Sequence, residues 1–167
     1  AQADLAFVDV EAFCRERLGD VGRGDRAIER LGLADLARGD DLERAHAAGD
    51  VRNELLRALP RNERERVLAL AELVPLKPRQ VLVEANLFVR HAYFLETGVA
   101  SVLASAEPRK PMEVCLVGRR GFVGIPIVLG TGRSPMRIMV QIKGHAWRIP
   151  ALEFETLVSE CPRLRRV

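Results

Sequence analysis

A glycine-rich segment in the C-terminal third of the chain has the composition of a ligand-binding loop. Five glycines lie between positions 118 and 132, a short apolar run occupies 125–129, and Arg133-Ser134-Pro135 follows. A chain that leaves a sheet, makes one short turn of helix and returns beside an arginine can offer N–H groups and a cation to an anion. The composition therefore predicts a site for a small, negatively charged molecule.

Alternating apolar residues on both sides of this segment predict the strands that position it. Met112–Val117 and Met136–Ile142 each alternate with period two, which is typical of strands with unequal faces. Similar short runs recur about every ten residues, a spacing that favours an antiparallel sandwich or barrel over alternating strand–helix units. The other runs are Val81–Val83, Arg90–Leu95, Val99–Ala104 and His145–Ile149.

Capping residues and prolines predict helices before and after the strands. Asn53 is suited to cap a helix that Pro60 ends, and Asn62 with Glu65 forms a capping-box pair that opens a second helix. Pro75 and Pro78 are expected to end this helical region. A further helix is predicted to begin after Pro150 and to stop at Cys161-Pro162.

The charge divides the 167 residues into two parts. Residues 1–50 hold 12 acidic and 7 basic side chains, whereas residues 51–167 hold 11 acidic and 19 basic ones. We expect 1–50 to be a helical, acidic arm that packs on the domain or on a partner chain, and 51–167 to be one domain. The basic charge fits either solubility or proximity to nucleic acid. Aromatic residues are too few for a single-strand stacking platform.

Several functional classes are disfavoured by what the sequence lacks. It contains no apolar run of 18 residues, and its first residues do not resemble a secretory signal. The three cysteines are far apart and the three histidines are scattered, so no disulfide framework or metal site is predicted. His91 beside Tyr93 is interpreted as a strand residue paired to a neighbour. No nucleophile elbow or phosphate loop is present. We therefore expect a cytoplasmic protein that is not an enzyme.

The order of these elements resembles the sensory domain of the Crp/Fnr superfamily of bacterial transcription regulators. The resemblance covers residues 51–167, without the winged helix-turn-helix of that family. It implies an α+β fold: an antiparallel β-roll, or jelly-roll barrel, of the cyclic nucleotide-binding type, flanked by helices. The matching phrases are Asn53-Glu-Leu-Leu56, Arg90-His-Ala-Tyr-Phe-Leu95, Thr97-Gly98-Val99, Val117-Gly-Arg-Arg-Gly-Phe-Val-Gly124 and Arg133-Ser134.

The resemblance also implies which positions would contact a ligand. Gly124 matches the glycine that precedes a ribose-binding glutamate, but Ile125 stands where that glutamate is expected. Arg133-Ser134 matches the pair that holds the cyclic phosphate, whereas Pro135 replaces an alanine and removes an N–H donor. The candidate ligand residues are therefore Gly124, Ile125, Arg133 and Ser134, in a degenerate site. No resident cofactor is predicted, and a cyclic nucleotide stays open as a ligand.

The functional hypothesis is an effector-sensing domain of a Crp/Fnr-type regulator. It would act as a homodimer or through a regulator partner, and would reach DNA only through a segment outside this chain. A small anion is one candidate for the effector. The alternative is a ligand-free interaction module, in which Ile125, Ile127 and Leu129 fill the roll and the acidic arm 1–50 mediates protein contacts.

Overall fold

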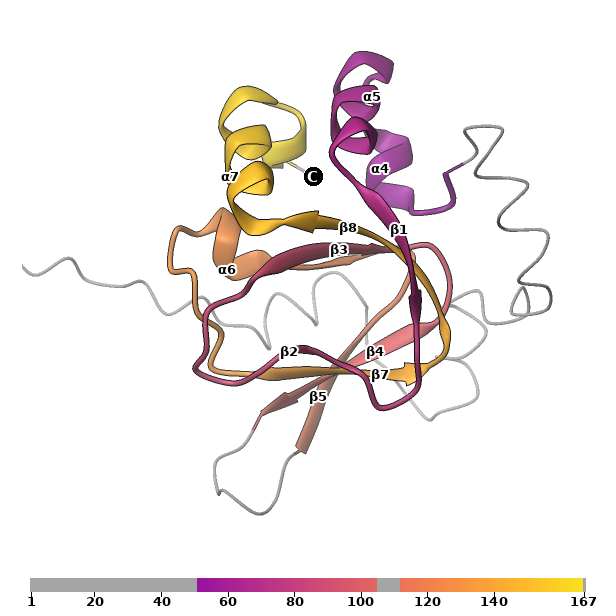
Figure 1. Ribbon diagram of the computed structural model, residues 1–167, viewed down its shortest axis with the longest axis vertical. Coiled ribbons are helices and arrows are strands. Elements are labelled where there is room, and N and C mark those ends of the chain that lie inside the picture. The colour runs from indigo at the N-terminus through magenta and orange to yellow at the C-terminus, as the bar shows by residue number, and fades with distance from the viewer. Residues whose placement is uncertain (1–50, 105–111, 167) are drawn as a thin grey trace, which may run out of the picture.

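The computed structural model describes residues 51–104 and 112–166 (Figure 1). The arm expected at 1–50 lies outside the described residues. The helices are α4 (Glu54–Ala58), α5 (Arg61–Ala69), α6 (Ile125–Val128), α7 (Ala151–Glu160) and the 3-10 turn η2 (Leu164–Arg166). The strands are β1 (Glu72–Leu76), β2 (Val81–Val83), β3 (His91–Leu95), β4 (Val99–Ala104), β5 (Met112–Val117), β6 (Phe122–Val123), β7 (Arg137–Ile142) and β8 (Gly144–Pro150).

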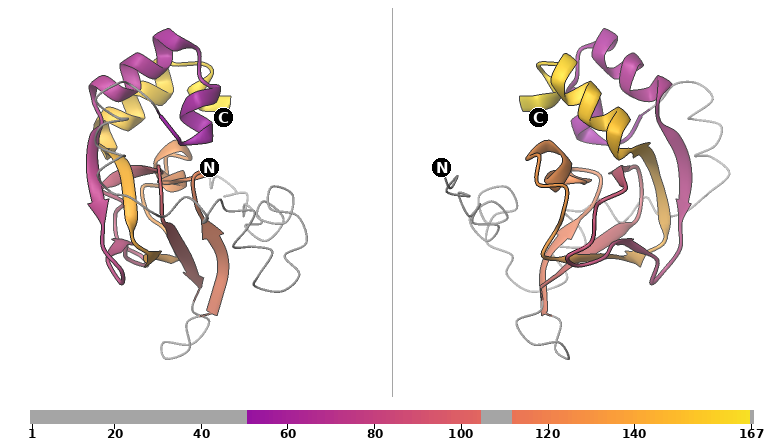
Figure 2. Two further views of the ribbon diagram at one scale, coloured as in Figure 1. Left: turned by 90° about the vertical axis from the view of Figure 1, so that its right-hand side faces the viewer. Right: turned by 60° about the vertical axis from the view of Figure 1, so that its left-hand side comes forward.

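The strands form two antiparallel sheets that face each other as a β-roll. Sheet A has the order β1-β8-β3-β6, and sheet B has the order β2-β7-β4-β5. Strands that follow each other in sequence often belong to different sheets, and several of the connections between them are short: one residue separates β7 from β8, and three separate β3 from β4. The helices lie on the side of sheet A that faces away from sheet B (Figures 1 and 2). The expected α+β roll is confirmed.

Most sequence-predicted elements are confirmed, and two expectations are wrong. The helical region does not continue to Pro75, because α5 ends at Ala69 and β1 begins at Glu72. Pro75 fits within β1 because this strand lies at the edge of sheet A, where a missing N–H costs no ladder bond. Asn62 does not cap α5 either, since Pro60 is the N-cap and makes no side-chain cap. The two-residue strand β6 was also missed.

The two faces of sheet A bury different kinds of residue. On its outer face, Phe94 and Phe122 stack with ring centroids 5.4 Å apart, and Phe154 of α7 meets Phe94 edge-on at 5.7 Å. Strand alternation turns Leu95 and its cross-strand partner Ala146 toward sheet B, and both are fully buried. The outer face therefore binds the helices, and the inner face closes the roll.

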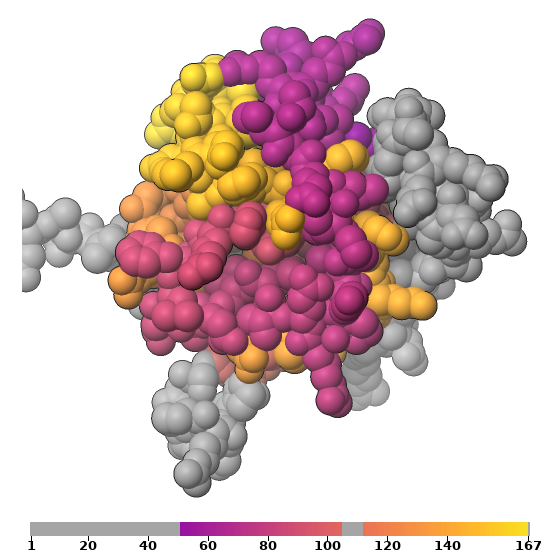
Figure 3. Space-filling model, in the orientation of Figure 1, coloured from indigo at the N-terminus to yellow at the C-terminus, as the bar shows by residue number. Residues whose placement is uncertain are grey.

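The C-terminal elements α7 and η2 are joined to α5 by a hydrogen bond and an ion pair. The N–H of Leu164 donates to the buried carboxylate of Glu63 at 3.1 Å, and Arg66 forms an ion pair with Glu160. Figure 3 shows α7 and α5 in contact over this part of the surface. The helices before and after the roll consequently form one layer.

Asn53 and Glu96 form a buried polar network between this helical layer and the sheets. The Asn53 side-chain oxygen caps α4, and its Nδ2 donates to the carbonyls of Leu95 at 2.9 Å and Gly121 at 3.0 Å. The Glu96 carboxylate accepts the N–H groups of Arg52 at 2.6 Å and Asn53 at 3.2 Å. Both side chains are almost fully buried, so each of these bonds replaces one that water would otherwise supply.

Replacing Asn53 tests how much stability this network contributes. We expect Asn53→Ala to lower the free energy of unfolding by about 2–4 kcal/mol, because it removes a helix cap and leaves two carbonyls unpaired. The exposed Asn62, within α5, supplies a matched control whose alanine variant should change stability by less than about 0.5 kcal/mol. Urea unfolding of both variants gives the comparison. An equal decrease in the free energy of unfolding in both variants would show that the buried network of Asn53 contributes no more stability than an exposed side chain.

Candidate ligand site

The glycine-rich segment folds as a compact turn of helix between β6 and β7. Gly124 caps α6 with φ of +135°, a conformation that residues with a side chain rarely adopt. A Cβ there would lie 3.1 Å from the Cα of Ala92 on β3. After α6 the chain reverses, and the N–H groups of Thr131 and Gly132 both donate to the carbonyl of Pro126 at 3.0 Å. The backbone path of the segment is therefore fixed by its glycines.

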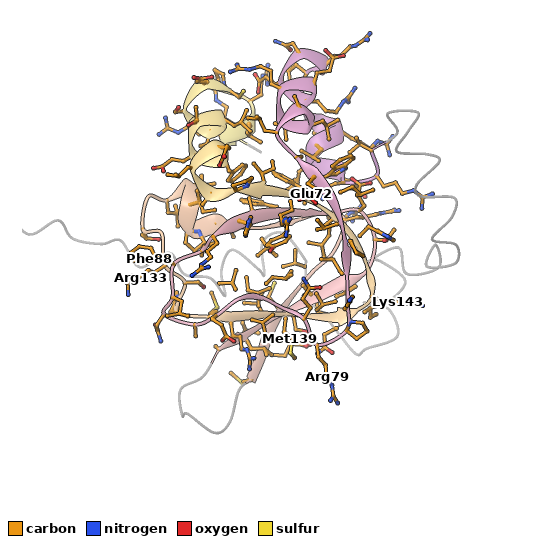
Figure 4. All side chains as sticks on the ribbon, viewed as in Figure 1. Glu72, Arg79, Phe88, Arg133, Met139 and Lys143 are labelled. Carbon is orange, nitrogen blue, oxygen red and sulfur yellow. The ribbon has the colours of Figure 1, made fainter. Side chains whose placement is uncertain are left out.

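Arg133 lies on the outside of the roll, against an exposed aromatic ring. Its guanidinium carbon is 4.0 Å from the ring centroid of Phe88, and its Nη1 donates to the carbonyl of Asn86 at 3.3 Å. Figure 4 shows Arg133 and Phe88 together at the edge of the molecule, below α6. The side chain is exposed. Its cation is thus engaged by the loop before β3 and does not reach into the roll.

Ser134 is buried and completes a turn with its side chain. Its hydroxyl oxygen accepts the N–H of Met136 at 3.1 Å, and its carbonyl accepts the N–H of Asn86 at 2.6 Å. Pro135 follows and supplies no N–H. The serine hydroxyl therefore already serves the turn before β7.

The four sequence-predicted residues fall into two separate pairs. Gly124 and Ile125 open α6, whereas Arg133 and Ser134 lie in the return loop; no hydrogen bond within the described residues joins one pair to the other. The apolar residues of the segment also differ. Of Ile125, Ile127 and Leu129, only Ile127 is buried, at 7% exposed. Of these three side chains, Ile127 therefore packs into the roll, whereas Ile125 and Leu129 are exposed to solvent.

A polar cluster on the inner face of sheet A was missed by sequence reasoning. Glu72 on β1, Arg148 on β8 and Tyr93 on β3 are aligned in register, and His91 lies two residues from Tyr93 on the same face. The carboxylate of Glu72 pairs with Arg148 at 2.5 Å, and the rings of His91 and Tyr93 are 6.0 Å apart. The alternation of His91 and Tyr93 is visible in the sequence, but their partners on β1 and β8 are not.

The charged groups around the His91 ring are, on balance, positive. Burial is the main reason that the pKa of His91 lies below its ordinary value of 6.5, and Arg148 and Arg90 lower it further. Glu153 and Glu72 act in the opposite direction with smaller effect. Burial also raises the pKa of Tyr93, so its phenol stays protonated at neutral pH. The cluster therefore presents a neutral histidine and a phenol beside cationic arginines.

Other sites within the described residues are less developed. No group of His, Cys, Asp and Glu in this part of the chain could hold a metal ion, and none of its helices has the length and apolarity to cross a membrane. A cavity of about 50 Å³ lies under η2, between the helices and sheet A. Its lining is almost entirely apolar: Leu55, Phe94, Phe122, Val128, Phe154, Leu164 and Arg165.

Comparisons with known proteins identify the fold. No protein-family model and no curated protein matches the sequence. Among solved structures, the catabolite activator protein of Thermus thermophilus matches with a TM-score of 0.58 at 12% identity, over 67% of this chain and 53% of that one. The sensor domain of the transcriptional regulator DNR from Pseudomonas aeruginosa matches with a TM-score of 0.55 at 13% identity, over 66% of this chain and 74% of that one.

A eukaryotic structure matches equally well. The regulatory domain of Toxoplasma gondii PKA, crystallised with cAMP, has a TM-score of 0.58 at 15% identity, over 69% of this chain and 43% of that one. The chain thus spans about half of the Thermus protein and less than half of the Toxoplasma one. At these identities the likeness shows the fold, which is that of cyclic nucleotide-binding domains and Crp/Fnr-type sensory domains.

The lowered pKa of His91 predicts a pH dependence of stability. A histidine that binds its proton less well in the folded state makes the protein less stable as the pH falls through 6.5, because protonation favours the unfolded chain. We expect the free energy of unfolding to rise between about pH 5 and 7.5, and more steeply than in a His91→Gln variant.

An NMR titration of the His91 ring measures the same property directly. Its pKa should lie below 6.5 in the wild type and should rise in an Arg148→Gln variant, which removes one of the cations. A wild-type value at or above 6.5 would contradict the arrangement described here.

Proposed function

We propose that residues 51–167 act as the effector-sensing, regulatory domain of a Crp/Fnr-type transcription regulator, with a degenerate cyclic nucleotide site. The similarity of the fold to sensor domains and to cyclic nucleotide-binding domains supports the regulatory role. The placement of Arg133 is the observation that carries the second part. A cation stacked outside on Phe88 is not positioned for a phosphate inside the roll.

The sugar side of such a site is also unfavourable. Ile125 offers no acceptor to a ribose hydroxyl, and a hydroxyl left unpaired in a buried pocket costs about 1–3 kcal/mol. The Ser134 hydroxyl oxygen accepts the N–H of Met136, which holds this side chain in the turn before β7. A cyclic nucleotide would therefore have to displace Arg133 from Phe88 at its phosphate end, and its ribose hydroxyl would still lack an acceptor from Ile125.

In this proposal the effector state reaches the rest of the regulator through the helical layer. α6 contacts α7, and α7 packs by Phe154 on the rings of Phe94 and Phe122. A shift of α6 would therefore be transmitted to α7 and η2. A dimer contact or a DNA-binding segment outside this chain would respond to that shift, in the cytoplasm and without catalysis.

A nucleotide titration tests the degenerate site. We expect millimolar cAMP and cGMP to leave the melting temperature of the full chain unchanged, because neither the phosphate nor the ribose finds its partner. A ligand present at 100 times its dissociation constant would instead add about 2.7 kcal/mol to the free energy of unfolding. Differential scanning calorimetry distinguishes the two results.

Variants of two arginines identify the source of any shift. Arg133→Ala removes the candidate phosphate ligand, and Arg137→Ala removes an exposed arginine that pairs with Glu84 at the start of β7. A nucleotide-dependent shift that disappears in Arg133→Ala and persists in Arg137→Ala would show a working cyclic nucleotide site and overturn this part of the proposal.

A second candidate function is an interaction module that binds no small molecule. The observation that favours it is an exposed apolar surface beside the return loop. Leu87 is 59% exposed, Phe88 65% and Leu129 51%, and Arg133 covers one face of the Phe88 ring. Apolar side chains grouped in this way on a protein surface often mark a contact with another protein.

Deletion of residues 1–45 tests whether the acidic arm takes part in such contacts. If the arm packs on the basic domain or on a second copy, its removal should lower the melting temperature or the oligomeric mass measured by light scattering. Removal should have a smaller effect at high salt, which screens the charges. Unchanged mass and melting temperature would show that the arm is a passive extension.

A further inference from the structure

The inner face of sheet A changes from apolar to polar along its strands. Leu95 and Ala146 are adjacent in register and fully buried. Two residues further along the same face, their places are taken by Tyr93 and Arg148, which are also cross-strand neighbours. The Arg148 side chain is 36% exposed, so the polar end of the face lies where the roll opens to solvent.

Tyr93 is largely buried, but its hydroxyl group is at the solvent-accessible end of the ring. The residue is 7% exposed, and its hydroxyl makes no hydrogen bond to the described part of the chain. The ring nitrogens of His91, beside it, make none either. Both groups are hydrogen-bonded to solvent rather than to the described part of the protein, so a molecule bound beside Arg148 could replace that water.

Arg148 is the cation on this face. Its Nη2 pairs with Glu72, the first residue of β1, whose side chain is 67% exposed. A guanidinium has five N–H donors, so one such pair leaves others for a second partner. Arg90 lies close enough to act on His91 as well, and at that ring the two arginines outweigh Glu72 and Glu153.

We propose that Arg148, Tyr93 and His91 bind a small oxyanion, a phosphate or a carboxylate, on the inner face of sheet A. This inference rests on the proposed sensory function and names the chemistry of its effector. Arg148 provides the charge and two parallel donors, Tyr93 donates its hydroxyl, and His91 takes up a proton as the anion arrives.

The location connects the anion to the glycine-rich segment. Tyr93 pairs in register with Val123 of β6, and the next residue is Gly124, whose backbone lies against Ala92. An anion at Tyr93 would therefore lie beside Val123, the residue before the N-cap of α6. It would act on the same helix that a ligand of the return loop would move, but through a cation on β8 rather than Arg133.

Titration of the full chain with sodium phosphate and with sodium acetate, at constant ionic strength against chloride, tests the proposal. We expect chemical-shift changes that saturate, with the largest changes at His91 and Tyr93, and a rise in the pKa of His91 on binding. Arg148→Gln should weaken binding by about tenfold or more, and Tyr93→Phe by roughly three- to tenfold. Whether phosphate or acetate binds more tightly identifies the class of oxyanion.

Arg133→Gln is the matched control, since it removes an arginine outside the roll and should leave the affinity unchanged. Arg148→Lys keeps the charge but not the fork of donors, and is used if Arg148→Gln does not fold. Shifts that fail to saturate, or that are equal in wild type and Arg148→Gln, would show an adventitious ion only. Loss of binding in Arg133→Gln alone would place the anion at the return loop.

The outcome is separable from that of the proposed function. Stabilisation by cAMP that depends on Arg133 would overturn the degenerate site, whatever phosphate does. Absence of saturable anion binding, with cAMP also inert, would overturn only the assignment of Arg148, Tyr93 and His91.

Discussion

The buried carboxylate of Glu96 holds the N-terminal helix of the domain against the end of β3. It accepts two backbone N–H groups just before α4, while the N–H of Glu96 itself donates to the carbonyl of His145 on β8. Asn53 then connects α4 to the turn before β6 through the carbonyl of Gly121. Because β6 leads directly into α6, the helical layer and the candidate ligand segment are positioned by the same buried network.

The backbone of the glycine-rich segment is held independently of the side chains in its return loop. The backbone of the glycine-rich segment is fixed by Gly124 against β3 and by the reversal at Pro126. Neither constraint depends on what the side chains of the return loop bind. Arg133 is therefore free to stack on Phe88 outside the roll, while Arg148 supplies a cation on the inner face of sheet A. The path of the chain is similar to that of cyclic nucleotide-binding domains.

The fold was largely accessible from the sequence, and the site was not. Alternation identified the strands, and Asn53 and Pro60 marked α4, because these signals act within a few residues. The same local reasoning failed at β1, where apolar residues around Pro75 fit a helix end as well as an edge strand. It also selected Arg133 by its position in a motif, since nothing local indicates that the loop before β3 would supply Phe88 to cover it.

Residue order alone determined that an antiparallel roll forms and where its turns lie, because period and turn chemistry are properties of neighbouring residues. Only the tertiary structure decided which side chains meet. Gly98 and Gly144 are recognisable in the sequence as residues near turns, but their backbones pack so closely that a Cβ on Gly144 would lie 2.2 Å from the carbonyl oxygen of Thr97. Likewise Glu72 and Arg148 are 76 positions apart and become neighbours through strand register. Register is set by the packing of whole sheets, which no short stretch of sequence contains.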